Sequence, residues 1–149
     1  MAARIEARRA RAWLVEERHA PESWIVLHES ILRRPIIPRD AMADQLAHIV
    51  EVASKRRIVV QVLPLETEAQ PLLMGTTRLM TFSDAPPVMY TEGMYSGQLV
   101  DDPRLVKLYA KAFGRVRAAA LAPGRSLRLI EQAAEGYRNG KYPKRVVGK

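Results

Sequence analysis

The sequence predicts an α+β domain in which a mostly antiparallel sheet of about four strands packs against helices. Two observations support this fold class. Apolar runs of strand length occupy 58–63 and 88–92, and each is bounded by proline, glycine or charged residues. Apolar side chains also recur at intervals of three and four along 40–56 and 123–137, which is the spacing of helices with one buried face.

The length of 149 residues is that of one ordinary domain, and hydrophobic residues make up 48% of the chain. We expect a single domain over 1–137, with an N-terminal helix at 2–19 and a core at 23–137. The final segment, 138–149, holds basic residues and no acidic residue, which is typical of a flexible basic tail.

The first strand is predicted to begin at Trp24 and to pass into a turn or short helix. Strict alternation along this strand would place Glu29 on its apolar face. Such a carboxylate either lies at the rim of the sheet or is buried against a cation. We therefore expect a structural ion pair between Glu29 and Arg33 or Arg34.

The middle of the chain predicts a helix followed by a meander of strands. Asp40 is placed to cap the helix 40–56. The run 58–63 is apolar except for Gln61, which indicates a central strand covered on both faces. A short proline-containing turn joins 78–82 to 88–92 and predicts an antiparallel hairpin, and 98–100 predicts a last short strand.

Two helices are predicted to end the fold. Asp101 or Asp102 is placed to cap the first, with Pro103 in its first turn, and Pro123 begins the second. The predicted buried face of the first helix has Phe113 beside it and consists of Leu105, Tyr109, Ala112, Val116 and Ala119 or Ala120. Four cations form a basic stripe on a separate face of this helix: Arg104, Lys107, Lys111 and Arg115.

The formal net charge of +8 is unevenly distributed along the chain. Residues 1–102 carry 12 basic and 14 acidic side chains, whereas 103–149 carry 12 and 2. A basic block of this size suits nucleic acid, an acidic partner protein or an anionic ligand, although a solvated basic face has the same pattern. Aromatic residues are only 6% and no helix-turn-helix pair is recognisable, so we do not expect sequence-specific reading of nucleic acid.

Several classes of protein are disfavoured by what the sequence lacks. No apolar run reaches the roughly 18 residues of a membrane span, so we expect no membrane insertion. The absence of cysteine excludes disulfides and thiolate sites, and favours the cytoplasm. With no HExxH motif and no glycine-rich phosphate loop, we expect no metal site and no cofactor.

Polar groups beside the apolar strands are the candidates for a functional site. If the chain is an enzyme, a carboxylate and a tyrosine hydroxyl could protonate or orient a substrate, and the candidate catalytic residues are Glu29, Tyr90 and Glu92. Flexible methionines can line a pocket for an apolar ligand, or simply fill a core. The candidate ligand-binding residues are His28, Gln61, Met74, Met80, Met89 and Met94.

A series of short motifs resembles the C-terminal, antitoxin-like domain of actinobacterial helix-turn-helix regulators of the XRE type. The resemblance covers roughly residues 4–137 and rests on many motifs in the same order. These motifs are WIVLHESILRR (24–34), QL (45–46), VQVLP (60–64), MTF (80–82), VMYTE (88–92), DDP (101–103) and RAAALAP (117–123) followed by Ser126 and Leu127.

The resemblance implies a cytoplasmic regulatory domain that mediates oligomerisation or ligand sensing, often beside a small acidic partner protein. It brings no catalytic residues with it. We expect this chain to lack the DNA-reading domain of such regulators and to be a free-standing or excised domain that forms a homodimer. The alternative is a cofactor-free enzyme of specialised metabolism, repurposed from this domain to perform proton transfer or cyclisation on a small apolar molecule in a Met-lined pocket.

Overall fold

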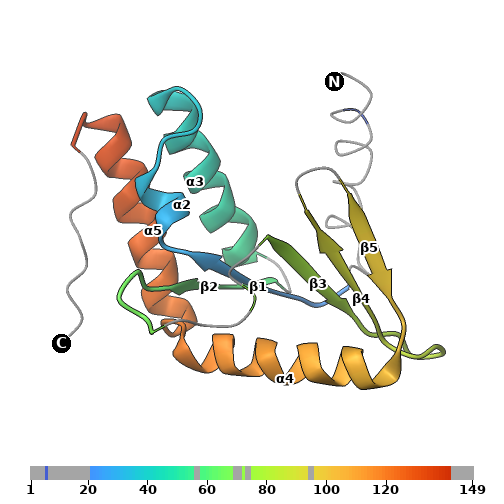
Figure 1. Cartoon of the computed structure of the whole chain (residues 1–149). Coiled ribbons are helices and arrows are strands. Elements are labelled where there is room, and N and C mark those ends of the chain that lie inside the picture. The colour runs from blue at the N-terminus through green and yellow to red at the C-terminus, as the bar shows by residue number, and fades with distance from the viewer. Residues whose placement is uncertain are drawn as a thin grey trace.

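The computed structural model describes residues 6, 21–55, 58–68, 72, 75–93 and 96–141 (Figure 1). The predicted helix 2–19, apart from residue 6, and the tail beyond Lys141 lie outside the described residues. The elements are β1 (Ser23–His28), α2 (Ser30–Arg33), α3 (Arg39–Lys55), β2 (Ile58–Leu63), β3 (Thr76–Met80), β4 (Val88–Glu92), β5 (Gly97–Val100), α4 (Pro103–Ala119) and α5 (Pro123–Arg138). The α+β class and the single compact domain are confirmed.

The described strands form two small sheets, so the prediction of one mostly antiparallel sheet of about four strands is wrong. β1 and β2 pair in parallel, from Ser23 opposite Ile58 to His28 opposite Leu63. The chain between them forms α3, a helix of 17 residues. A crossover of this length returns the chain to the end where β1 began, and parallel pairing requires such a connection.

β3, β4 and β5 form the second sheet, in that order and with antiparallel neighbours. The predicted hairpin is therefore confirmed, with β4 at the predicted bounds. β3 lies earlier than the predicted strand 78–82, because Thr76 pairs with Glu92 and Met80 pairs with Val88. Phe82 consequently lies beyond the strand, with 51% of its surface exposed.

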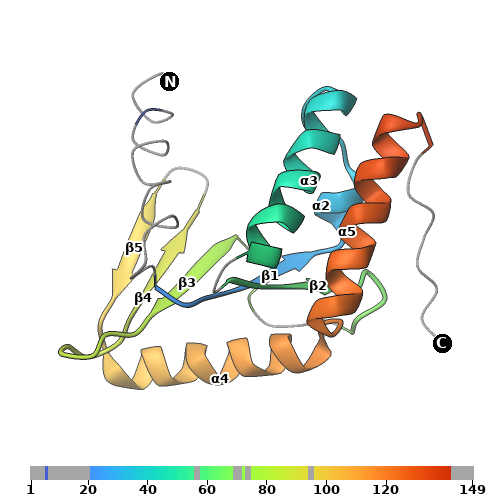
Figure 2. The same cartoon turned by 180° about the vertical axis from the view of Figure 1, so that it is seen from behind.

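Helices cover both faces of the parallel pair (Figures 1 and 2). α3 and α5 pack together on one face of β2, whereas α4 contacts β2 from the other side. The helix α4 also contacts β3 and β4, so it forms a common base beneath both sheets. β2 is covered on both faces, as predicted, but it is not the centre of a larger sheet among the described strands.

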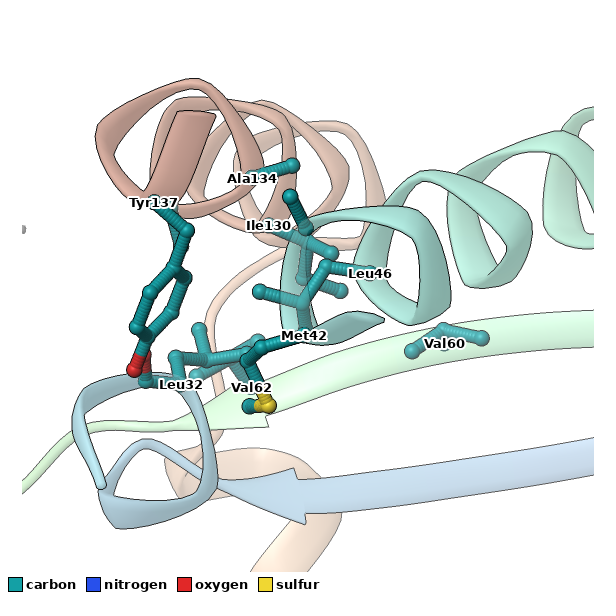
Figure 3. Close-up of a cluster of buried hydrophobic side chains, with 10 residues drawn as sticks. Leu32, Met42, Leu46, Val60, Val62, Ile130, Ala134 and Tyr137 are labelled. Atoms are coloured by element: carbon teal, nitrogen blue, oxygen red, sulfur yellow. The ribbon is translucent and has the colours of Figure 1, made fainter. Parts of the chain in front are cut away.

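The main core lies between α3, α5 and β2 (Figure 3). Leu46 and Ile130 are almost completely buried there, and each such side chain contributes about 1.5–3 kcal/mol by leaving water. The Tyr137 hydroxyl donates a hydrogen bond of 2.9 Å to the Leu32 carbonyl, which fixes α5 against α2. The core cluster comprises Leu32, Met42, Ala43, Leu46, Val60, Val62, Ile130, Ala133, Ala134 and Tyr137.

The outer edge of β2 is closed by the start of α5. The Leu121 amide donates to the Val62 carbonyl at 2.8 Å, and the Val62 amide donates to Ser126 Oγ at 2.9 Å. Ser126 is fully buried and also lies 3.1 Å from the Leu121 carbonyl oxygen. A side chain therefore takes the place of a neighbouring strand at this position, which satisfies a buried backbone donor.

Helix ends follow the predicted signals in part. Asp102 caps α4 by accepting hydrogen bonds from the amides of Arg104 and Leu105, with Pro103 at the first position. Asp40, by contrast, lies inside the first turn of α3, because that helix already begins at Arg39. None of the helices in the described ranges combines the length and the apolar character needed to cross a bilayer.

The buried face of α4 agrees with the prediction except near the start of the helix, since Tyr109, Ala112 and Phe113 are half-buried. Val106 and Val116 are buried, whereas Leu105 is 45% exposed. α4 packs under two sheets, so the sheet positions set its orientation.

Candidate functional site

The predicted site residues fall on two different sheets. Glu29 and His28 lie at the end of β1, and Gln61 lies on its partner β2. Met80 belongs to β3, while Met89, Tyr90 and Glu92 belong to β4. Met74 and Met94 lie outside the described residues. The candidate catalytic groups are thus divided between the two sheets.

Glu29 is held in an ion pair, as predicted. Its side chain is 3% exposed, and Oε1 accepts a hydrogen bond of 2.8 Å from Arg33 Nε and a further one from the second terminal nitrogen of the same guanidinium. Its other oxygen, Oε2, accepts from the Leu65 amide at 2.9 Å. The carboxylate therefore ties the end of β1 to α2 and to the loop after β2.

The other polar groups of the parallel sheet also have partners. His28 Nδ1 lies 2.7 Å from Ser30 Oγ. The Gln61 side-chain oxygen accepts from Trp24 Nε1 at 2.7 Å, and its amide nitrogen donates to the Leu121 carbonyl at 2.8 Å. Gln61 therefore links β1, β2 and the turn between α4 and α5, which is a structural use of a buried amide.

Arg117 completes this cluster from the end of α4. Its guanidinium carbon lies 3.4 Å from the centre of the Trp24 ring and 5.9 Å from that of Phe113. Such stacking on an aromatic face is favourable, most of all when water is excluded. Arg117 Nε is buried, and no hydrogen-bond partner for it occurs among the described residues.

The second sheet holds the remaining candidates. Met89 is completely buried, Met80 and Tyr90 are half-buried, and Glu92 is exposed. The hydroxyl end of Tyr90 lies over Gly97 of β5, where a Cβ atom would come within 1.9 Å of the hydroxyl oxygen. A side chain at position 97 would displace the Tyr90 ring from this place.

A shallow surface hollow, too small to enclose a water molecule, lies between the start of α3 and the end of α5. Its lining consists of Arg39, Gly136, Tyr137, Gly140 and Lys141, none of which is a predicted site residue. Within the described ranges, no group of three or more His, Asp or Glu side chains is placed to hold a metal ion.

The outward side of α4 carries the predicted basic stripe. Its four cations, Arg104, Lys107, Lys111 and Arg115, are all exposed, and α4 contains no acidic residue. The stripe spans about 16 Å along the helix axis. Leu108, which is 61% exposed, lies between these cations in sequence.

One acidic group borders the stripe. Asp102 lies 3.4 Å from the terminal nitrogen of Arg104. The hydrogen bond from the Arg104 amide, followed by that from its side chain, lowers the pKa of Asp102 below its usual value of 3.8. Asp102 therefore stays ionised in mildly acidic solution, where it neutralises one end of the stripe.

Comparison with known families gives a match over most of the chain. Residues 1–132 match a family described as a domain of unknown function, DUF5753. The chain belongs to this family. No curated protein and no solved structure matches the chain. The family description assigns no activity, so a function for this DUF5753 domain has to be argued from its own residues.

Sequence reasoning missed three residues that organise this DUF5753 domain. Arg117 falls outside the basic stripe, and its stacking on Trp24 depends on the approach of α4 to β1. Ser126 was noted only as part of a motif and of a helix, and its hydrogen bond from the Val62 amide was not predicted. Gly97 adjoined a predicted strand, and a glycine next to a strand can indicate close approach of another group, which here is Tyr90.

Proposed function

We propose that this chain is a protein-binding and self-association domain, and that the outward side of α4 binds an acidic segment of a partner protein. One observation carries the proposal: four exposed cations and an exposed leucine share one side of a helix that has no acidic residue. The resemblance to the C-terminal domain of XRE-type regulators supports a cytoplasmic regulatory role.

The basic stripe destabilises α4 when no partner is bound. Like charges at intervals of three and four repel one another, and cations near a helix N-terminus oppose the helix dipole. Lys107 and Arg104 lie in the first two turns of α4. Within the described part of the chain, Arg104 is the one cation of the stripe with a carboxylate partner, which is Asp102. An anionic partner would remove this repulsion and gain salt-dependent attraction.

A protein partner accounts for the leucines as well as the cations. Leu108 is 61% exposed and Leu105 is 45% exposed, and both would be buried by a partner that offers apolar side chains beside its carboxylates. Nucleic acid would use the cations alone. A membrane surface would need the apolar side of α4, which is occupied by the two sheets.

Binding to a synthetic acidic peptide tests the proposal. The probe is a fluorescein-labelled helical peptide with glutamates every four residues and leucines beside them, titrated in about 150 mM salt. We expect Lys107→Glu combined with Lys111→Glu to weaken its binding at least about tenfold. The matched control is Arg125→Glu with Arg128→Glu on α5, which makes the same charge change at exposed positions.

Three results would contradict the proposal. The first is an equal loss of affinity in the α5 control, which would indicate a non-specific charge effect. The second is tighter binding of a random duplex of about 20 base pairs than of the peptide, which would favour nucleic acid. The third is stronger attachment to vesicles of anionic lipid, which would favour a membrane surface.

The alternative of a cofactor-free enzyme has little geometric support. Both carboxylate oxygens of Glu29 already accept hydrogen bonds, one from Arg33 and the other from the Leu65 amide. Glu29 also directly follows β1, whereas Tyr90 and Glu92 lie on the other sheet. The hollow beside α5 borders none of these groups. The same geometry favours a protein partner over a small apolar molecule for the binding role.

A further inference from the structure

Among the described residues, β5 is the outermost strand of the second sheet. It is the last strand in the order β3-β4-β5, and no described strand pairs with its outer side. Native proteins commonly protect such edges with charged residues, prolines or bulges. The sequence of β5, Gly-Gln-Leu-Val, contains no charge and no proline, and its pairing with β4 runs without a bulge.

The hydrogen-bonding pattern shows which residues of β5 face outward. The Gly93 amide donates to the Ser96 carbonyl at 2.8 Å, so this opposed pair is hydrogen-bonded. Hydrogen-bonded and non-bonded pairs alternate along an antiparallel ladder. Gln98 therefore bonds to β4, whereas the amides and carbonyls of Gly97 and Leu99 point away from it.

The side chains at this edge are arranged for a neighbour. Leu99 is opposite Tyr90 and lies on the same face of the sheet, with 61% of its surface exposed. Gly97 lies on the same face. Because it has no side chain, the hydroxyl end of Tyr90 from β4 occupies the space above it. A leucine opposite Gly97 on an added strand would cover the outer side of the Tyr90 ring.

We infer that two copies of this chain associate by antiparallel pairing of β5 with β5, which joins their second sheets into one continuous sheet. Gln98 would lie on the two-fold axis, opposite Gln98 of the second copy. Gly97 would then face Leu99 of the second copy, and each of these two pairs would exchange two main-chain hydrogen bonds. The inference deepens the self-association part of the proposed function and is independent of partner binding by α4.

A second copy fits this edge better than an arbitrary strand because the pattern is self-complementary. The outward residues Gly97 and Leu99 are two positions apart, so a two-fold axis through Gln98 places each leucine against a glycine. Along β4 and β5 the only charged side chain is that of Glu92. Repulsion between two copies is therefore small at this edge.

The contact is small for a dimer interface. Stable specific interfaces bury in total about 1,200–2,000 Å² of surface, and pairing of four residues buries less. We therefore expect a weak dimer whose population rises with protein concentration. Sedimentation velocity of the full chain between about 10 µM and about 1 mM should show this rise.

Matched lysine variants test which surface is used. Leu99→Lys should abolish the rise in sedimentation coefficient, because it places a charge against the paired edge. Ile36→Lys, in the loop between α2 and α3, is the control, since Ile36 is also an aliphatic residue with most of its surface exposed (77%), and both changes add the same charge. Circular dichroism of both variants establishes that the fold is retained.

Single cysteines test the register, because the natural chain contains none. Gln98→Cys places two thiols opposite each other in a non-bonded pair, with Cα atoms about 4.5 Å apart, which permits a disulfide. Leu99→Cys places its two Cα atoms about 8 Å apart, which is too far. We expect oxidation to cross-link the first variant at least about tenfold faster than the second.

The outcomes separate this inference from the proposed function. A wild-type chain that stays monomeric throughout would overturn both the β5 pairing and self-association, and would leave peptide binding by α4 unaffected. Self-association that survives Leu99→Lys, or equal cross-linking of the two cysteine variants, would overturn the β5 pairing alone.

Discussion

Glu29 joins three segments at the scale of a single residue. Its carboxylate accepts hydrogen bonds from Arg33 and from the Leu65 amide, while its own amide donates to the Leu63 carbonyl at 2.9 Å. A buried carboxylate with these partners is stabilising only as long as the cation remains. Its contacts therefore indicate a structural role at the junction of the two parallel strands.

Replacing Glu29 with glutamine should lower the free energy of unfolding by about 2–3 kcal/mol. The amide can still accept from Leu65, but the Arg33 guanidinium, whose side chain is 20% exposed, loses its carboxylate. Urea denaturation followed by circular dichroism measures the loss. The control Arg34→Gln, at an exposed position, should change stability by less than about 0.5 kcal/mol. Equal midpoints for the two variants would show that the ion pair contributes nothing.

At the scale of an element, the N-terminal ends of α4 and α5 are stabilised in different ways. Asp102 caps α4, and the lowered pKa of its carboxyl reflects the amide and side-chain hydrogen bonds from Arg104. Ala122 precedes α5 and provides no side-chain cap. Ser126 instead points its hydroxyl at the turn before the helix, where it lies 3.1 Å from the Ala122 carbonyl oxygen. This hydroxyl also accepts a hydrogen bond from the Val62 amide, which joins α5 to β2.

Ser126→Ala should destabilise the chain by about 1–3 kcal/mol, because it leaves the fully buried Val62 amide without an acceptor. The measurement is the midpoint of urea unfolding. The matched control is Ser54→Ala at an exposed position of α3, which we expect to be within about 0.5 kcal/mol of the wild type. A cost no larger than that of Ser54→Ala would mean that water replaces the hydroxyl.

At the scale of the whole molecule, α4 is the element shared by the two sheets. It contacts β2 on one side of the fold and β3 and β4 on the other (Figure 1). Arg117, in the last turn of α4, also contacts Trp24 of β1. The same helix presents its cations to solvent, so the proposed docking surface lies on the element that connects the two sheets.

This arrangement predicts a single cooperative unfolding transition. Leu46 belongs to α3 and lies in the main core, whereas Met89 belongs to the second sheet. Both side chains are almost completely buried. Leu46→Ala and Met89→Ala should each cost about 2–5 kcal/mol and shift the same transition. Tryptophan fluorescence and far-UV circular dichroism should give coincident urea curves for both variants. A separate early transition in Met89→Ala alone would show that the second sheet unfolds independently.

The sequence by itself determined most of the elements and one of the polar contacts. Helix 40–56, strand 58–63 and the hairpin returning at 88–92 follow from apolar periodicity and from turn residues, which act within a few positions. The ion pair of Glu29 with Arg33 was predictable because a carboxylate on an apolar strand needs a nearby cation. The basic stripe on α4 was likewise set by spacing along one helix.

Only the tertiary structure decided how the elements pair and which surfaces remain open. The parallel pairing of β1 with β2, the separation into two sheets and the exposure of Leu105 on α4 depend on residues far apart in sequence. The candidate catalytic groups were divided between the sheets for the same reason. Strand partners are chosen by which faces the helices can bury, and that is a property of the whole packed chain. The position of β5 as the outermost described strand of its sheet, with Gly97 and Leu99 facing outward, follows from this packing.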